Sequence, residues 1–215
     1  MTTLVIVRHG HTAINDGDRF RGITDTPLSE LGLQQSRRTA EEIAGRWRLS
    51  AVYTSSVVRA RMTALEIGSP FGLEPVDDPG LYDMDYGEWT GLSFEDARMR
   101  DAKLFRTCME RPGSFRAPGG QSFEELRGRS MAAALAIAER HEDQAVAIVS
   151  HTVIVRLLLL AILGMPTDSF WKLRPGTCAL NVVSVSRGGC VLDCINDGCH
   201  VRSLAGKRAA TASLT

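Results

Sequence analysis

The chain has 215 residues, and its 25 lysine and arginine residues balance 25 aspartate and glutamate residues. This balance excludes an overall field that would attract nucleic acid or an anionic membrane, so any site for an anion must be local. The length suits one α/β domain, and the composition does not shift along the chain. We therefore expect a single domain over residues 1–204 and a mobile tail over residues 205–215, where small and polar residues dominate.

Predicted strands and helices alternate along the chain. In order, they are a strand at 4–7, a helix from a Ser29 cap to near Leu49, a strand at 51–53, a helix at 57–67, a looser segment at 72–118 with two short helices, a helix at 122–141, a strand at 145–149, a helix at 152–163, and strands at 179–185 and 190–195. This interleaving predicts a three-layer α/β/α sandwich around a mainly parallel central sheet with an antiparallel edge.

Cations and imidazoles follow three of the predicted strands. Arg8 and His9 come directly after the first strand, Arg59 lies one turn into the helix after the second, and His151 follows the strand at 145–149. Ligands of α/β sheets bind at the carboxyl ends of the strands, and two guanidinium groups beside helix amino termini suit a phosphate dianion. A neutral His9 could also act as a nucleophile, through a ring nitrogen that the sequence does not identify.

The cysteines and the apolar segments bear on location and metal binding. Five cysteines, an odd number, indicate reduced thiols, and the spacing of Cys190, Cys194, Cys199 and His200 differs from that of zinc modules. The run at 153–163 is too short to span a bilayer, and the amino-terminal sequence lacks the pattern of an export signal. We expect a cytoplasmic protein with no metal, no cofactor and no membrane partner.

The residues at the strand ends belong to a longer pattern that resembles the histidine phosphatase superfamily, in the branch that includes cofactor-dependent phosphoglycerate mutases (branch 1). The matching pieces extend to about residue 200 and lie at 7–15, 21–32, 54–64, 84–91, 118–122 and 150–156. This resemblance implies that His9 becomes phosphorylated. It also implies phosphate contacts from four side chains, those of Arg8, Arg59, His151 and Asn15.

A departing alkoxide needs a proton, and a carboxyl group with a raised pKa can supply it. The family usually has a glutamate at the position of Asp83, whose side chain is one methylene shorter. We predict that Asp83 is the general acid and base, with Glu88 as the reserve and Asp85 as the third choice.

Further substrate contacts are expected around this centre. We predict them for Arg21, Gly22 and Thr152, and for Glu88 where it is not catalytic. Thr152 stands where relatives often carry glycine, and it either bonds to the phosphate or caps the following helix. Arg156 could reach the site, but it lies a turn and a half into an apolar helix, where we favour a structural ion pair.

Hydrolysis and mutase activity differ in what must cover the pocket. A mutase has to exclude water, and the segment at 91–118 is short for that task. Its six basic residues are nevertheless compatible with a polyanionic substrate. We predict a metal-independent phosphomonoester hydrolase that acts on a small phosphorylated metabolite through phosphohistidine. The alternatives are a cofactor-dependent phosphoglycerate mutase, a non-catalytic phosphate sensor and a metal-dependent hydrolase. A homodimer is left open.

Overall fold

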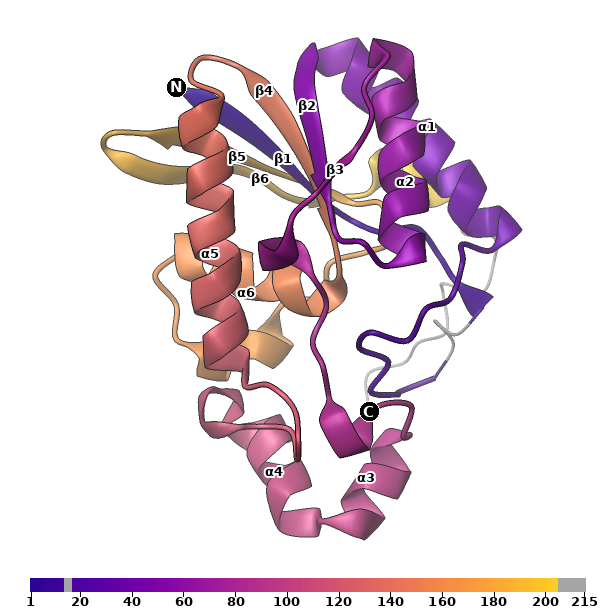
Figure 1. Cartoon of the computed structure of the whole chain (residues 1–215), viewed down its shortest axis with the longest axis vertical. Coiled ribbons are helices and arrows are strands. Elements are labelled where there is room, and N and C mark those ends of the chain that lie inside the picture. The colour runs from indigo at the N-terminus through magenta and orange to yellow at the C-terminus, as the bar shows by residue number, and fades with distance from the viewer. Residues whose placement is uncertain (14–16, 205–215) are drawn as a thin grey trace.

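A six-stranded sheet forms the centre of the computed structural model, which describes residues 1–13 and 17–204 (Figure 1). The strands are β1 (Thr2–Arg8), β2 (Leu49–Thr54), β3 (Val76–Asp77), β4 (Ala145–Ser150), β5 (Leu180–Ser186) and β6 (Gly189–Asp197). They lie in the order β3-β2-β4-β1-β5-β6. The first four are parallel, whereas β5 pairs antiparallel with both β1 and β6. The predicted mainly parallel sheet with an antiparallel edge is confirmed.

The apolar run of β1 is buried on both faces of the sheet. Side chains alternate across a strand, so Leu4 and Ile6 enter one hydrophobic core while Val5 and Val7 enter the other. The register pairs Arg8 with Ser150 at the end of β4. The carboxyl ends of β1 and β4 are therefore level, and the residues that follow them emerge at the same edge.

Helices cover both faces of the sheet, as predicted (Figure 1). The longer ones are α1 (Glu30–Arg46), α2 (Val58–Gly68), α5 (Phe123–Arg140) and α6 (Thr152–Ile162). Helices α1 and α2 share a core with Val5 and Val7, and α5 and α6 share one with Leu4 and Ile6. The predicted end of α1 near Leu49 is wrong, because the chain is already extended at Trp47 and Leu49 is buried as the first residue of β2.

The segment between β3 and α5 holds the two short helices expected there, α3 (Phe94–Arg100) and α4 (Ala102–Glu110). Ser93 and Asp101 cap their amino termini. Short 3₁₀ helices of one or two turns lie between these elements: η2 (Ser69–Phe71), η3 (Pro79–Leu81), η4 (Gly87–Trp89), η5 (Pro112–Ser114), η6 (Thr167–Lys172) and η7 (Cys199–Leu204). None of the helices in residues 1–13 and 17–204 has the length and apolar character needed to cross a bilayer. The predicted tail at 205–215 lies outside the described residues.

Candidate active site

His9 follows β1 directly, and its ring has a defined orientation. Its Nδ1 lies 2.7 Å from the carbonyl oxygen of Gly10, which can only accept a hydrogen bond. Nδ1 therefore carries the proton, and Nε2 carries the lone pair. Nε2 accepts a hydrogen bond from Nε of Arg59 at 3.3 Å. The geometry thus identifies Nε2 as the nitrogen that is able to attack, which the sequence left open.

Gly10 is required at its position because the backbone passes close to the start of α1. A Cβ on Gly10 would lie 2.6 Å from the carbonyl oxygen of Gly32. The amide of Gly10 also donates to Oγ1 of Thr63 at 3.0 Å. The carbonyl that orients His9 is therefore held between α1 and α2.

Arg59, in the first turn of α2, is buried and uses all three of its guanidinium nitrogens. Nη1 donates to the carbonyl of Thr24 at 2.6 Å, and Nη2 donates to the carbonyl of Gly22 at 2.7 Å. Nη2 also lies 2.7 Å from Oδ2 of Asp83, and Nε contacts His9. A single side chain therefore joins the nucleophile to the carboxyl group that we predicted as the acid.

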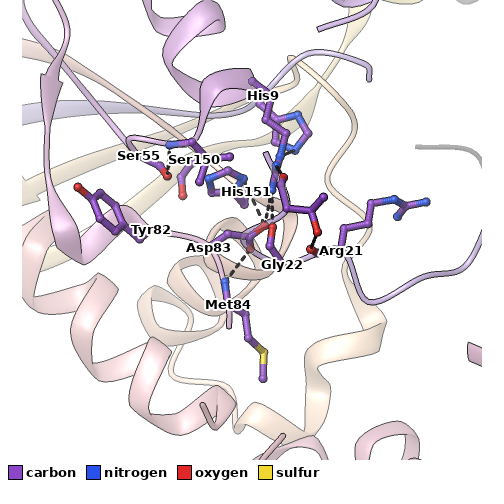
Figure 2. Close-up of polar contacts among 12 residues, drawn as sticks. His9, Arg21, Gly22, Ser55, Tyr82, Asp83, Met84, Ser150 and His151 are labelled. Carbon is purple, nitrogen blue, oxygen red and sulfur yellow. Dashed lines mark hydrogen bonds and ion pairs between the residues drawn. The ribbon is translucent and has the colours of Figure 1, made fainter. Parts of the chain in front are cut away.

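Asp83 is buried beside the two histidines (Figure 2). Its Oδ1 accepts from the amide of Met84 at 2.9 Å, and its Oδ2 lies 3.4 Å from Nδ1 of His151. Burial raises the pKa of Asp83, and the opposing effect of Arg59 is smaller. The pKa of Asp83 is therefore shifted in the direction that a general acid needs.

The two histidine rings are tilted against each other, with centroids 5.3 Å apart and planes at 57°. Burial lowers the pKa of His9 well below its usual 6.5, and the nearby His151, Arg8 and Arg59 lower it further. Burial also lowers the pKa of His151, followed by the charges of Arg59 and Arg8. Both imidazoles are thus held neutral, and Nε2 of His9 keeps the lone pair that a nucleophile needs.

Arg8 adds a second cation at the end of β1. Its Nη1 donates to the carbonyl of Pro175 at 2.9 Å, while its buried Nε has no hydrogen-bond partner among the described residues. Burial lowers the pKa of Arg8 to about 10, and the charges of Arg156 and Arg21 add to this effect. Such a group of cations is stabilised when an anion binds among them.

These side chains face a cavity of about 260 Å³. Of the predicted site residues, seven line it: Arg8, His9, Arg21, Gly22, Arg59, Asp83 and Thr152. His151 is buried against Asp83 and is not part of the lining. Asn15 falls outside the described residues. Thr152 is the first residue of α6, so the cavity also meets the amino terminus of that helix.

Glu88 is not brought to this cavity. Its side chain is 57% exposed, and its Oε2 lies 2.6 Å from Nη2 of Arg100. The reason is the 3₁₀ turn η4, which buries the neighbouring Trp89 completely and leaves Glu88 facing solvent. The placement of Glu88 as reserve acid or substrate contact is therefore wrong, and Asp83 is the carboxyl group beside His9.

Arg156 is the main residue that sequence reasoning misplaced. It makes no ion pair with any carboxylate in residues 1–13 and 17–204; instead it lines the cavity, with its guanidinium over the rings of Phe170 and Trp171. The signal available in the sequence was its spacing. Arg156 lies four residues after Thr152, which places both on one face of α6.

No group of three or more His, Cys, Asp or Glu side chains in the described ranges is placed to hold a metal ion. The chemistry of the cavity is instead that of an anion site with an oriented imidazole and a buried carboxyl group. Such a set can accept a phosphoryl group on nitrogen and transfer a proton to or from its oxygen partner.

Comparison with known proteins identifies the class. The model of the histidine phosphatase superfamily (branch 1) matches residues 4–198, and the chain belongs to this superfamily. The chain is 30% identical over 201 residues to phosphoserine phosphatase 1 of Hydrogenobacter thermophilus, covering 94% of this chain and 95% of that protein. It is 31% identical over 206 residues to a metal-independent phosphoserine phosphatase of Arabidopsis thaliana, covering 95% and 85%.

The fold agrees with this assignment. The solved structure of YhfR from Bacillus stearothermophilus superimposes with a TM-score of 0.87 at 28% identity, covering 94% of this chain and 100% of that one. The protein is accordingly a phosphatase of this superfamily that acts on a small phosphorylated metabolite, as predicted. The alternative of a non-catalytic phosphate sensor is not supported.

Proposed function

We propose that the protein hydrolyses O-phosphoserine without a metal ion, through a phosphohistidine at Nε2 of His9. The observation that carries the mechanism is the hydrogen bond from Nδ1 to Gly10, which leaves Nε2 facing Arg59, and Arg59 also binds Asp83. The names and nearly full-length matches of the two phosphoserine phosphatases support the choice of substrate.

In the first half-reaction, Nε2 of His9 attacks phosphorus and the ester P–O bond breaks. The serine alkoxide takes the proton of Asp83, and the phosphoryl oxygens lie between Arg8 and Arg59, two of the guanidinium groups that line the cavity. These groups stabilise the charge on the transferred phosphoryl group. The raised pKa of Asp83 favours the protonated state that this step requires.

In the second half-reaction, water attacks the phosphohistidine in line with the N–P bond. Asp83, now ionised, takes a proton from the water as the O–P bond forms and the N–P bond breaks. Inorganic phosphate leaves, and both His9 and Asp83 return to their starting protonation states. The same carboxyl group thus acts as acid and then as base.

The cavity offers more positive charge than one phosphate needs. Five arginines line it, Arg8, Arg19, Arg21, Arg59 and Arg156, against two carboxylates, Asp18 and Asp83. This set suits a substrate that carries a second anionic group and an amine, as phosphoserine does.

Mutase activity is less well supported. The six basic residues at 91–118, which in the sequence were compatible with a polyanionic substrate, all lie outside the cavity lining. Three of them form exposed ion pairs with glutamates instead, namely Arg98, Arg100 and Arg116. The segment at 91–118 therefore supplies no cation of the cavity lining to a second phosphate.

Release of phosphate from L-phosphoserine, with and without a chelator, tests the proposal. We expect saturable release that a chelator does not change. Isomerisation of 3-phosphoglycerate that is faster than its hydrolysis would favour the mutase, and loss of activity with the chelator would favour a metal-dependent hydrolase. The cytoplasmic location, the homodimer and the single domain stay predictions from the sequence.

A further inference from the structure

We propose that Arg156 binds the carboxylate of the substrate and so selects phosphorylated carboxylic acids over phosphate esters that lack this group. The inference rests on the proposed phosphoserine phosphatase activity and adds the residue that recognises the leaving group. It draws on the position of Arg156, on its lack of protein acceptors and on the aromatic rings beneath it.

Arg156 lines the same cavity as Arg8 and His9 but comes from α6 rather than from the end of β1. Thr152, Val153 and Arg156 all line the cavity from one face of α6. The charge of Arg156 lowers the pKa of Arg8, second only to burial, so the two guanidinium groups are electrostatically close. Tyr86 also lines the cavity.

The donors of Arg156 have no acceptor in the part of the chain that the structure describes. No hydrogen bond or ion pair of its guanidinium occurs there, and its buried Nε is without a partner. Arg59, by contrast, uses every guanidinium nitrogen on a protein group. A cation in a cavity wall without a counter-charge is costly, and the pKa of Arg156 is lowered to about 10, chiefly by burial. A bound anion would remove this cost.

Two aromatic rings, at 90° to each other, lie beside the guanidinium of Arg156. Its central carbon lies 4.8 Å from the ring centroid of Phe170 and 5.1 Å from that of Trp171. Phe170 stacks on Phe123 with centroids 4.3 Å apart, and the indole of Trp171 donates to the carbonyl of Cys108 at 2.8 Å. Contact with aromatic rings attracts a guanidinium group without using its N–H donors, and the fork of donors matches the two oxygens of a carboxylate.

The carboxylate is favoured over the phosphate as the partner of Arg156. The phosphoryl group must reach Nε2 of His9, where Arg8 and Arg59 already supply guanidinium groups. Arg156 comes from the second turn of a different element and lies against Phe170 and Trp171. A second, planar anion on the leaving group fits this place.

A matched pair of substrates isolates the carboxylate. L-Phosphoserine and phosphoethanolamine share the phosphate and the amine, and only the first has a carboxylate. We measure kcat/KM for both with the wild type, Arg156→Met, Arg156→Lys and Arg37→Met. Arg37 is the control because it is an exposed arginine of α1, paired with Glu66 outside the cavity.

We expect the ratio of kcat/KM for phosphoserine to that for phosphoethanolamine to fall about 10- to 100-fold in Arg156→Met, the range for a lost charged hydrogen bond. Arg156→Lys should fall in between, because it keeps the charge but loses the planar fork. Arg37→Met should keep the wild-type ratio. Melting temperatures of all variants show whether they fold. If Arg156→Met does not fold, the ratio measured for Arg156→Lys tests the proposal.

An unchanged ratio, or an equal loss with both substrates, would overturn the role of Arg156. Failure of the proposed substrate would look different. If the wild type does not hydrolyse phosphoserine, we compare 3-phosphoglycerate with glycerol 3-phosphate, which lacks the carboxylate. A preference for the acid that depends on Arg156 would support the inference while rejecting phosphoserine, and no preference in either pair would reject both.

Discussion

The cavity has two walls that are built in different ways. The hydrogen-bonded wall consists of Arg8, His9, Arg59 and Asp83, and the aromatic wall consists of Arg156, Phe170 and Trp171. In the first, side chains are fixed by short bonds to one another and to backbone carbonyls. In the second, a guanidinium rests on rings and directs its donors to no described protein group.

This difference separates the chemistry from the recognition. Transfer of a phosphoryl group needs donors and a nucleophile that are already in place, which the hydrogen-bonded wall provides. Recognition of a leaving group needs donors that are still available, which the aromatic wall provides. Variants of the first wall should therefore affect all substrates, and variants of the second should affect some substrates more than others.

The largest effect is expected from His9→Ala. Without the nucleophile, kcat should fall by about 10⁴-fold or more with every phosphate ester. Rapid quenching with labelled substrate should trap an acid-labile phosphohistidine in the wild type and none in the variant. His141→Asn is the control, since His141 ends α5 and lies outside the cavity. Near-normal turnover by His9→Ala would break the assignment of the hydrogen-bonded wall.

Asp83→Asn should be next in size, with kcat for phosphoserine lower by about 10²- to 10⁴-fold. p-Nitrophenyl phosphate has a leaving group that departs without a proton, so the variant should still form phosphohistidine from it. Hydrolysis of that intermediate lacks its base, and stopped-flow absorbance should show a burst followed by slow turnover. Glu88→Gln, at the exposed ion pair with Arg100, should behave like the wild type. If the burst is absent from Asp83→Asn but present in Glu88→Gln, the assignment of Asp83 as the catalytic carboxyl group is wrong.

The pH profile of kcat/KM should report the pKa values of two groups of the hydrogen-bonded wall, Asp83 and His9. Burial raises the pKa of Asp83 above its usual 3.8, and activity is lost as pH rises through that raised value, by about tenfold per unit. The lowered pKa of His9 keeps the imidazole neutral well below pH 6.5, so the acid limb should lie below that value. Asp83→Asn should lose the alkaline limb. An acid limb centred at 6.5 would contradict the buried, neutral histidine.

The smallest effect is expected in the aromatic wall. Trp171→Leu removes one of the two rings beneath Arg156, and the ratio of kcat/KM for phosphoserine to that for phosphoethanolamine should fall about 2- to 5-fold, the value of one cation–π contact. Trp171→Phe keeps an aromatic face and should keep the ratio, although it loses the bond to Cys108. If both variants change the ratio equally, the indole hydrogen bond rather than the ring supports Arg156.

Most of the hydrogen-bonded wall could be predicted from the sequence because it depends on where strands end. The apolar run before Arg8 and His9 places these residues at the sheet edge, and the same argument holds for His151. The ring orientation of His9 could not be predicted, because it depends on a contact with the carbonyl of Gly10 that spacing does not reveal. Asp83 was reached only through the resemblance to the family.

The errors lie where short-range geometry or distant contacts decide. Glu88 was misplaced because a single 3₁₀ turn determines which of two adjacent residues is buried. Arg156 was assigned an ion pair because its partners, Phe170 and Trp171, belong to η6, which follows α6 and folds back against it. The hydrophobic periodicity of α6 alone does not predict its contact with η6.

The bond from Arg59 to Nε2 of His9 also has a consequence for the empty enzyme. It engages the lone pair that must attack phosphorus, so the resting nucleophile is masked. Phosphate oxygens offer the guanidinium a stronger acceptor than a neutral imidazole does. A phosphate ester that enters the site would attract the Arg59 donor and so free Nε2 of His9. Substrate binding would thereby activate the nucleophile that attacks the substrate.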